Sequence, residues 1–211
     1  MSYFIFDGVL SLGKQYELKG DEYNHITKSR RLRPGDSFLI QDLEGRRFES
    51  ILKVFKGKSL IFIPLKTVEA PPPSSLQIEI LQALPKQKAL EFILQKTTEL
   101  GVSRLDLFLG MHSPKTFRFY EKLHHLNRWE RIVLESSKQC GRQFPPKIHL
   151  HPDIFAALET LQECPNSWIL VPEESDTVSW KKLSSSGDNI IKRHRLLIGP
   201  EGGFHQDELK I

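Results

Sequence analysis

The alternation of apolar and polar residues divides the chain into two parts with different patterns. Up to about residue 70, short alternating runs at residues 37–41 and 59–63 are separated by turn sequences, Pro34-Gly35-Asp36 and Glu44-Gly45. Closely spaced short strands divided by such turns are typical of antiparallel β domains. The pattern therefore predicts a small antiparallel β domain, a barrel in its simplest form.

Strand patterns alternate with helical ones in the second part. Helical periodicity is clearest at residues 86–100, where Leu90, Ile93, Leu94, Thr97 and Leu100 share a face before Gly101. Further helices are expected at 119–138 and 154–161. This alternation predicts an α/β domain with a parallel sheet, whose ligands gather at the carboxyl ends of the strands. The expected strands are residues 77–84, 105–109, 147–150, 168–171 and 196–198.

A proline-rich stretch, Val68-Glu69-Ala70-Pro71-Pro72-Pro73-Ser74-Ser75, lies between the two patterns. Three consecutive prolines donate no main-chain hydrogen bond and favour a stiff, extended spacer. We therefore place the β domain at residues 1–70, a linker at 71–75 and the α/β domain at 76–211.

The composition, 39% hydrophobic and 27% charged residues, is that of an ordinary globular protein. No apolar run approaches the roughly 20 residues of a membrane helix, and the N-terminus has no signal-peptide pattern. We therefore expect a cytoplasmic protein in which Cys140 and Cys164 are free thiols. His149 and His151 share one face of a strand, but without a third ligand no metal is expected. The commonest hydrolase motifs, Gly-x-Ser-x-Gly and His-Glu-x-x-His, are missing.

The net charge is only +4, but the charges are unevenly distributed. Residues 111–147 contain eight Lys or Arg against three acids, whereas residues 148–211 contain six against ten. The run Lys28-Ser29-Arg30-Arg31-Leu32-Arg33 adds four cations in six residues. Such clusters suit a polyanion such as nucleic acid, because each neutralised phosphate releases counterions. A solvated basic surface would give the same pattern, so charge alone leaves both interpretations open.

The sequence LLIGPEGGF at residues 196–204 leads a predicted strand into a glycine-rich turn with one carboxylate. A P-loop requires a lysine that reaches the phosphates, and a dinucleotide fingerprint requires Gly-x-Gly-x-x-Gly; the turn has neither. Its glycines permit close approach of a ligand to the main chain, and Glu201 disfavours an anion. An adenosyl group attached to a sulfonium fits these properties, although a purely structural turn explains them too.

Several stretches, in order along nearly the whole chain, carry a specific resemblance. They are HITKSRRLRPGD at 25–36, LEFILQKTTELGV at 90–102, Arg128-Trp129, QCGR at 139–142 followed by Pro146, and IGPEGGF at 198–204. Together they resemble the family of 16S rRNA uridine N3-methyltransferases, which belong to the SPOUT class of S-adenosylmethionine enzymes.

The resemblance implies an N-terminal PUA-like β-barrel that binds RNA and a C-terminal SPOUT-type α/β methyltransferase domain. The latter would have a parallel sheet and, in a complete protein, a trefoil knot, and the enzyme would be a homodimer. The implied reaction is methylation of N3 of a uridine in 16S rRNA of the small ribosomal subunit, the m3U1498 site in the family. The alternative is an RNA-binding or ribosome-assembly protein whose methyltransferase domain is inactive.

The sequence departs from the family pattern at several points. Ser29-Arg30 precede Arg31 where apolar residues are usual, Lys138 replaces a common glutamate, and His205 stands where a serine often caps a helix. The family's last segment, which completes the knot and half of the cofactor site, is expected beyond Ile211. A chain that ends at Ile211 is expected to bind S-adenosylmethionine weakly or not detectably.

The resemblance assigns binding roles to two sets of residues. Main-chain groups of the glycine turn and the end of the neighbouring strand would hold the cofactor: Leu197, Ile198, Gly199, Pro200, Glu201, Gly202 and Gly203, with Val171, Pro172 and Glu173. Glu173 and Glu174 could equally form a solvated loop. The expected RNA contacts are Lys28, Arg30, Arg31, Arg33, Lys86, Lys88 and Arg142.

Uridine N3 carries a proton at neutral pH, so the protein must position the base, remove the proton and stabilise the anion. Arg142 is the expected clamp on a phosphate or on the uracil anion, because Gly141 lets the chain turn off the preceding helix. An arginine paired with the helix C-terminus is the alternative. Glu201 is the nearest candidate for the base, although its backbone role could be its only one.

Overall fold

A computed structural model describes residues 3–72, 74–114, 125–164, 166–171 and 193–210. The chain divides into two compact units. The first consists of Met1–Pro73 together with Ser137–Phe144, and the second of Ser74–Ser136 together with Pro145–Ile211. The sequence did not indicate that Ser137–Phe144 belongs with the N-terminal residues. No helix of the described residues is long and apolar enough to cross a membrane.

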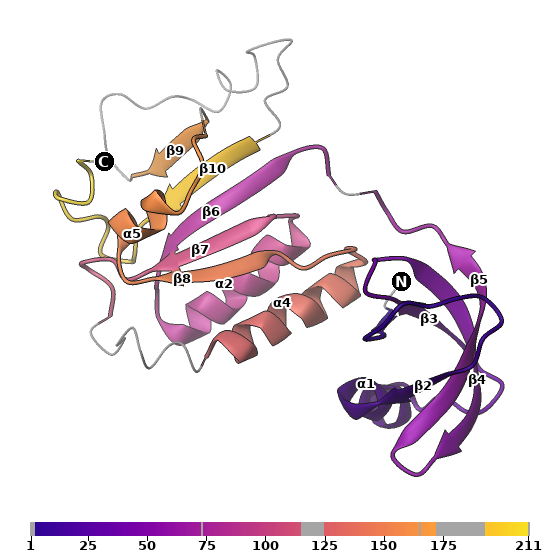
Figure 1. Cartoon of the computed structure of the whole chain (residues 1–211). Coiled ribbons are helices and arrows are strands. Elements are labelled where there is room, and N and C mark those ends of the chain that lie inside the picture. Colours follow the sequence, from indigo (N-terminus) through magenta and orange to yellow (C-terminus); the bar gives the residue numbers. More distant parts are fainter. Residues whose placement is uncertain (1–2, 73, 115–124, 165, 172–192, 211) are drawn as a thin grey trace. The chain divides into compact units, whose positions relative to one another are not determined.

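The first unit is built on a curled five-stranded sheet with the order β1-β3-β4-β5-β2 (Figure 1). The expected β domain is confirmed, but it is not wholly antiparallel, because β1 pairs parallel with β3. Register shifts between β4 and β5 are of the kind that bends a sheet. The strands are β1 (Phe4–Ile5), β2 (Tyr16–Lys19), β3 (Ser37–Gln41), β4 (Arg47–Lys56) and β5 (Ser59–Val68).

Aromatic rings fill the core of this sheet. Phe38 lies edge-on to both Phe4 and Phe62, with ring centroids 5.7 Å apart in each pair. These rings are buried, and edge-on contacts of this kind add to the energy of burial. Between β2 and β3 the chain forms α1 (Gly20–Asn24) and a π-helical turn, η1 (His25–Arg30), which the strand pattern did not predict.

The second unit contains a five-stranded sheet with the order β8-β7-β6-β10-β9 (Figure 1). Every pairing in it is parallel, which confirms the predicted α/β organisation. Each expected strand overlaps an observed one. The observed strands are β6 (Gln77–Ala83), β7 (Arg104–Phe108), β8 (Lys147–His151), β9 (Ser167–Leu170) and β10 (Arg193–Ile198).

Helices cover both faces of this sheet. On one face, α2 (Gln87–Glu99) and α4 (Leu126–Cys140) bury Leu94 and Trp129, as expected. On the other, α5 (Ile154–Glu159) packs on a separate apolar cluster. Gly101 follows α2 with φ of +93°, which confirms the expected stop. Leu100 was wrongly assigned to the buried face, since it lies at that stop and is 79% exposed. Residues 119–124 of the expected second helix lie outside the described residues.

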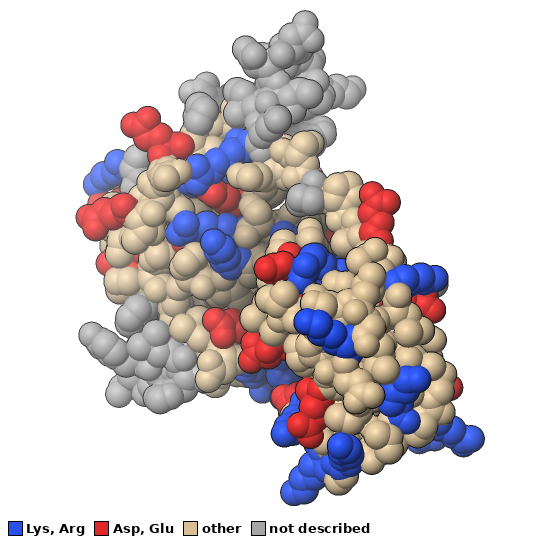
Figure 2. Space-filling model, turned by 45° about the vertical axis from the view of Figure 1, so that its right-hand side comes forward, with Lys and Arg blue, Asp and Glu red and all other residues tan. Residues whose placement is uncertain are grey.

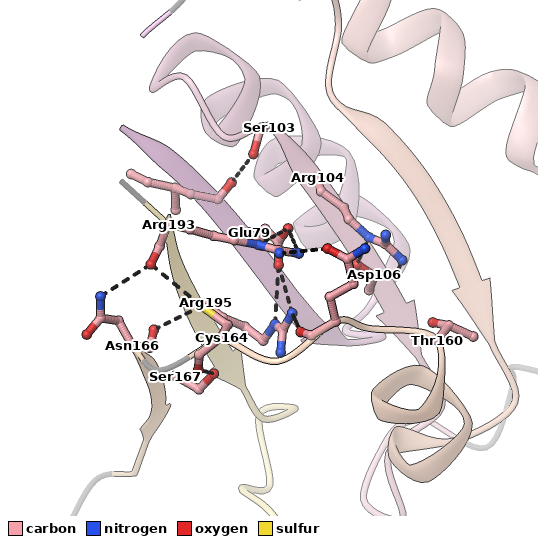
Figure 3. A network of polar contacts seen from close by, with 12 residues as sticks. Glu79, Ser103, Arg104, Asp106, Thr160, Cys164, Asn166, Ser167, Arg193 and Arg195 are labelled. Atoms are coloured by element: carbon pink, nitrogen blue, oxygen red, sulfur yellow. Dashed lines mark hydrogen bonds and ion pairs between the residues drawn. The ribbon is translucent and has the colours of Figure 1, made fainter. Parts of the chain in front are cut away.

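Paired charges occupy the sheet face that carries α5 (Figure 3). The buried carboxylate of Glu79 on β6 binds Arg193 and Arg195 of β10, at 2.7 and 3.0 Å. On β7, buried Asp106 binds Arg104 at 2.6 Å and His151 at 2.8 Å. Removing one partner from such a buried pair is costly, so the network constrains β10, the strand that leads into the glycine turn.

Candidate functional site

The glycine turn follows β10 at the carboxyl end of the strand. The amide of Gly203 donates to the carbonyl of Pro200 at 2.9 Å, and Gly203 has φ of +74°. A Cβ atom on Gly199 would lie 3.1 Å from the ring of Phe204. The turn therefore favours glycine at both positions: Gly203 for its backbone conformation, and Gly199 because a side chain there would crowd Phe204.

Two neighbouring segments anchor this turn. The side-chain amide of Gln82, on β6, is 3.4 Å from the carbonyl of Gly199. The carboxylate of Glu201 accepts a hydrogen bond from the amide of Lys86, at the start of α2, at 3.3 Å. This amide is one of the first-turn donors that have no partner within a helix. The turn is thus tied to the end of β6 and to the beginning of the next helix.

These hydrogen bonds also change the acidity of Glu201. Its own main-chain amide, and then that of Lys86, lower the pKa of the exposed Glu201 carboxyl. A carboxylate that already accepts such bonds holds its charge more firmly and is a weaker proton acceptor.

The loop after β7 forms another support, which the sequence analysis missed. The buried carboxylate of Glu208 accepts the amides of Met111 and His205, at 2.9 and 2.8 Å. Nearby, Nδ1 of His112 is 3.2 Å from the carbonyl of Gly203. The spacing of His205 and Glu208 is that of a capping box, the signal that could have identified Glu208.

The structure brings most of the expected cofactor residues together. Leu197 and Ile198 end β10, and residues 199–203 form the turn. Leu170 is the register partner of Ile198, so the half-buried Val171 follows the adjacent strand at the same edge of the sheet. Pro172, Glu173 and Glu174 lie outside the described residues.

The basic run of the first unit lies on an unusual backbone. Lys28 and Arg30 belong to η1, and Arg31 follows with φ of +51°, the one positive value of a non-glycine residue in the described parts of the chain. The carbonyl of buried Ile26 accepts the amides of both Arg31 and Leu32. Lys28, Arg30, Arg31 and Arg33 are all exposed. Short π-helical turns such as η1 occur frequently at functional sites.

Among the described residues on the face in Figure 2, cations are not gathered into one continuous surface. In the face shown in Figure 2, Lys and Arg side chains are interspersed with Asp and Glu. Lys86 and Lys88, also expected to contact RNA, are exposed at the start of α2 in the second unit. Recognition of a polyanion would therefore depend on local clusters such as residues 28–33.

Arg142 lies two residues beyond the end of α4, after Gly141. Gly141 has φ of +80°, and the amide of Arg142 donates to the carbonyl of Ser137 at 2.9 Å. This is the Schellman pattern of helix termination, and it confirms that Gly141 turns the chain off the helix. Arg142 is half-buried, and burial lowers the pKa of its guanidinium. It belongs to the first unit, whereas Glu201 belongs to the second.

His149 and His151, the two imidazoles of β8, have different surroundings. Nε2 of His151 is engaged with Asp106, while Nε2 of His149 is buried without a hydrogen bond. Over the ranges that the structure describes, no three His, Cys, Asp or Glu residues are grouped so as to hold a metal ion.

Known proteins resemble this chain over nearly its full length. Ribosomal RNA small subunit methyltransferase E of Buchnera aphidicola (subsp. Acyrthosiphon pisum) is 28% identical over 210 residues, which cover 95% of this chain and 77% of the relative. The protein of that name from Bacillus subtilis is 23% identical over 197 residues, covering 92% and 77%. The solved structure of the Neisseria gonorrhoeae enzyme, bound to S-adenosyl methionine, has a TM-score of 0.83 at 22% identity, covering 100% and 84%.

The structural likeness confirms the expected fold class, a PUA-like sheet followed by an α/β methyltransferase domain. The trefoil knot stays a prediction. Residues 18–65 match the model of an RNA methyltransferase PUA domain, and residues 72–211 match that of an RNA methyltransferase domain. Since the second match alone covers more than half of the chain, the protein belongs to the RNA methyltransferase family.

Proposed function

We propose that the protein transfers a methyl group from S-adenosylmethionine to N3 of a uridine in 16S rRNA, at the m3U1498 site that the family resemblance implies. The observation that carries the proposal is the glycine turn after β10, within a chain whose residues 72–211 match an RNA methyltransferase domain. The names of the relatives support small-subunit rRNA as the substrate. A cytoplasmic location follows from that substrate.

The residues at the carboxyl ends of β9 and β10 fit the cofactor. Residues 199–204 contain no lysine or arginine and one carboxylate, so they suit a ligand without excess negative charge. The glycines at 199, 202 and 203 leave main-chain atoms accessible to an adenosyl group. When bound, S-adenosylmethionine supplies an electrophilic methyl group on a positively charged sulfur. The proposed holding residues are Leu197, Ile198, Gly199, Pro200, Glu201, Gly202 and Gly203, with Val171, Pro172 and Glu173.

Arg142 is assigned to the nucleotide. Deprotonation of N3 leaves an anion on uracil, and a guanidinium stabilises such an anion or clamps a flanking phosphate. Although burial lowers its pKa, an arginine stays protonated at neutral pH. Glu201 is the proton acceptor nearest to the turn, but its lowered pKa and its bond to the amide of Lys86 support an orienting role instead.

The assigned contacts to the RNA backbone are Lys28, Arg30, Arg31, Arg33, Lys86 and Lys88. Six cations in two local groups, at 28–33 and at 86–88, suit RNA, because each contributes one phosphate contact. We also assign a homodimer, in line with the family resemblance. Phe92 on α2 and Leu100 just beyond it are 61% and 79% exposed, and a second copy would remove these apolar surfaces from water.

The proposal is tested on a form of the protein that includes the family's last segment, by methyl transfer to small-subunit rRNA, with the product nucleoside identified by mass spectrometry. Arg142→Ala should reduce transfer by about 100-fold or more, as the loss of one preorganised donor does, and calorimetry should show S-adenosylmethionine affinity within about twofold of the original. The control is Arg128→Ala, which removes an exposed arginine of α4 that pairs with Glu91.

Each contrary result has a distinct meaning. Methylation at an atom other than N3 would refute the assigned product. RNA binding without detectable cofactor affinity or transfer would favour the alternative, an RNA-binding assembly protein with an inactive methyltransferase domain. Equal loss of transfer and of cofactor affinity in Arg142→Ala would give Arg142 a structural role.

A further inference from the structure

The segment that carries Arg142 is held by side chains of the N-terminal sheet. Three successive carbonyl groups, those of residues 141–143, each accept a hydrogen bond from a different side chain of the first unit. Arg47 donates to Gly141 at 2.8 Å, the hydroxyl of Tyr3 donates to Arg142, and Gln41 donates to Gln143 at 2.7 Å.

The three donors form one buried group, here called the Arg47 clamp (Tyr3, Gln41 and Arg47). Nε of Arg47 donates to Oε1 of Gln41 at 3.0 Å, and its guanidinium lies 4.1 Å above the centre of the Tyr3 ring. Tyr3 is 1% exposed, and the other two are 5% exposed. Buried donors of this kind require partners, so the clamp and the carbonyls that it binds stabilise one another.

The main chain of Arg142 is held at both its amide and its carbonyl, the latter by the clamp. The amide of Arg142 is already fixed to the carbonyl of Ser137, and its carbonyl and those of its two neighbours are fixed by the clamp. The point from which the Arg142 side chain extends is therefore set by the first unit. A guanidinium that must meet a reacting base benefits from such a fixed origin, because small displacements of catalytic groups reduce rates strongly.

We propose that Arg47, through the clamp, is a positioning residue that sets the place of Arg142 for methyl transfer. This rests on the function proposed for Arg142 above. Arg47 is itself buried and bound to Gly141 and Gln41, so its role is to orient the neighbouring arginine rather than to meet the RNA.

The adjacent Arg46 offers a matched control. It donates to Asp42 at 2.7 Å and to the carbonyl of Leu10 at 3.2 Å, in the same unit but outside the strands. Arg47→Met, which keeps an aliphatic chain over Tyr3, should reduce kcat by about 10- to 100-fold with KM for S-adenosylmethionine nearly unchanged. Arg46→Met should leave kcat unchanged. Tyr3→Phe removes one hydroxyl, keeps the ring beneath the Arg47 guanidinium and should reduce kcat in the same direction by a smaller factor.

A double-mutant cycle separates positioning from general damage. If Arg47 acts through Arg142, Arg47→Met has no further effect on the residual rate of the Arg142→Ala protein. An equal fold-reduction in both backgrounds would overturn the inference. So would an Arg47→Met protein whose kcat matches that of Arg46→Met.

Hydrogen exchange gives a readout that needs no turnover. Amides of residues 141–144 should exchange at least about tenfold faster in Arg47→Met, because their local opening costs less free energy. Their exchange rates should be unchanged in Arg46→Met. If these amides exchange as slowly in Arg47→Met as in the original protein, the inferred role of the clamp is overturned, whether or not methyl transfer is detected. Full transfer by Arg142→Ala would instead refute the function proposed for Arg142, and with it the positioning role, while leaving the exchange result intact.

Discussion

Arg31 stands out among single residues because of its backbone. A left-handed conformation at a non-glycine residue costs about 1 kcal/mol, yet here it lies in the middle of the basic run. The carbonyl of Ile26, buried in the core, accepts the amides of Arg31 and Leu32 and so holds the strained residue in place. Strain that the surroundings maintain at an exposed cation favours a binding role for it.

This strain allows stability to be separated from binding. Arg31→Gly should keep or raise the free energy of unfolding, since glycine accepts this conformation, whereas Arg30→Gly within η1 should lower it by about 1 kcal/mol. Both should weaken RNA binding, because each removes a cation. Denaturant unfolding and RNA titration on both proteins check this. If Arg31→Gly lowered the free energy of unfolding as much as Arg30→Gly does, the inferred backbone strain at Arg31 would be refuted.

Among the secondary-structure elements, β8 gives the fold a pH dependence. Burial, and then the charge of Arg104, lower the pKa of His149 below its usual 6.5, outweighing the opposite effect of Asp106. His151 and Lys147 act in the same direction as Arg104. Because the unfolded chain binds the proton more readily, the contribution of His149 to stability is complete above about pH 6.5 and is lost as the pH falls below it.

His149→Leu should therefore flatten this dependence. Urea unfolding at pH 7.5 and 5.5 should show a larger fall in unfolding free energy for the original protein than for the variant. The same fall in both proteins would mean that other groups account for the acid sensitivity. Protonation of Asp106, whose ion pairs with His151 and Arg104 outweigh burial and lower its pKa, belongs to a more acidic range, below about pH 4.

Elements with strong local patterns were predictable from the sequence, and those defined by distant partners were not. Strands β3 and β5, the strands of the second sheet and helix α2 follow from apolar periodicity, and the stops at Gly101 and Gly141 from glycine at a helix end. Strands β1, β2 and β4 were not predicted. The helical turns at 20–30 were missed because they bury little, with only Ile26 fully enclosed. The parallel pairing of β1 joins residues far apart in sequence, which periodicity cannot reveal.

At the scale of the whole molecule, RNA binding should be strongly salt-dependent although the net charge is only +4. Replacing Arg31 and Arg33 by alanine should reduce the slope of log affinity against log salt concentration by about 0.7 for each phosphate that is no longer neutralised. Replacing Lys19 and Lys66, exposed lysines outside the basic run, removes the same charge and should leave the slope nearly unchanged. Equal effects of the two pairs would indicate attraction by net charge alone.

The glycine turn could be predicted from the sequence because strand, turn and carboxylate are contiguous. The contacts of Gln82 and Lys86 with the turn could not, since these residues come from two other segments. Glu208 differs, because its spacing from His205 is a local signal. The Arg47 clamp was even less predictable from the sequence. Its hydrogen bonds join residues 94 to 139 positions apart, and no local spacing marks such a set.

Ser137–Phe144 belong to the first unit, and this limits which segments of the gene can be exchanged by recombination. A recombination event that exchanged only the first 73 codons would bring in a new sheet but leave its eight-residue complement behind in the old gene. The new residues at the positions of the Arg47 clamp would then have to bind a 137–144 segment that did not evolve with them. Successful swaps must therefore carry both pieces, so the two halves of the gene are expected to diverge together rather than as interchangeable modules.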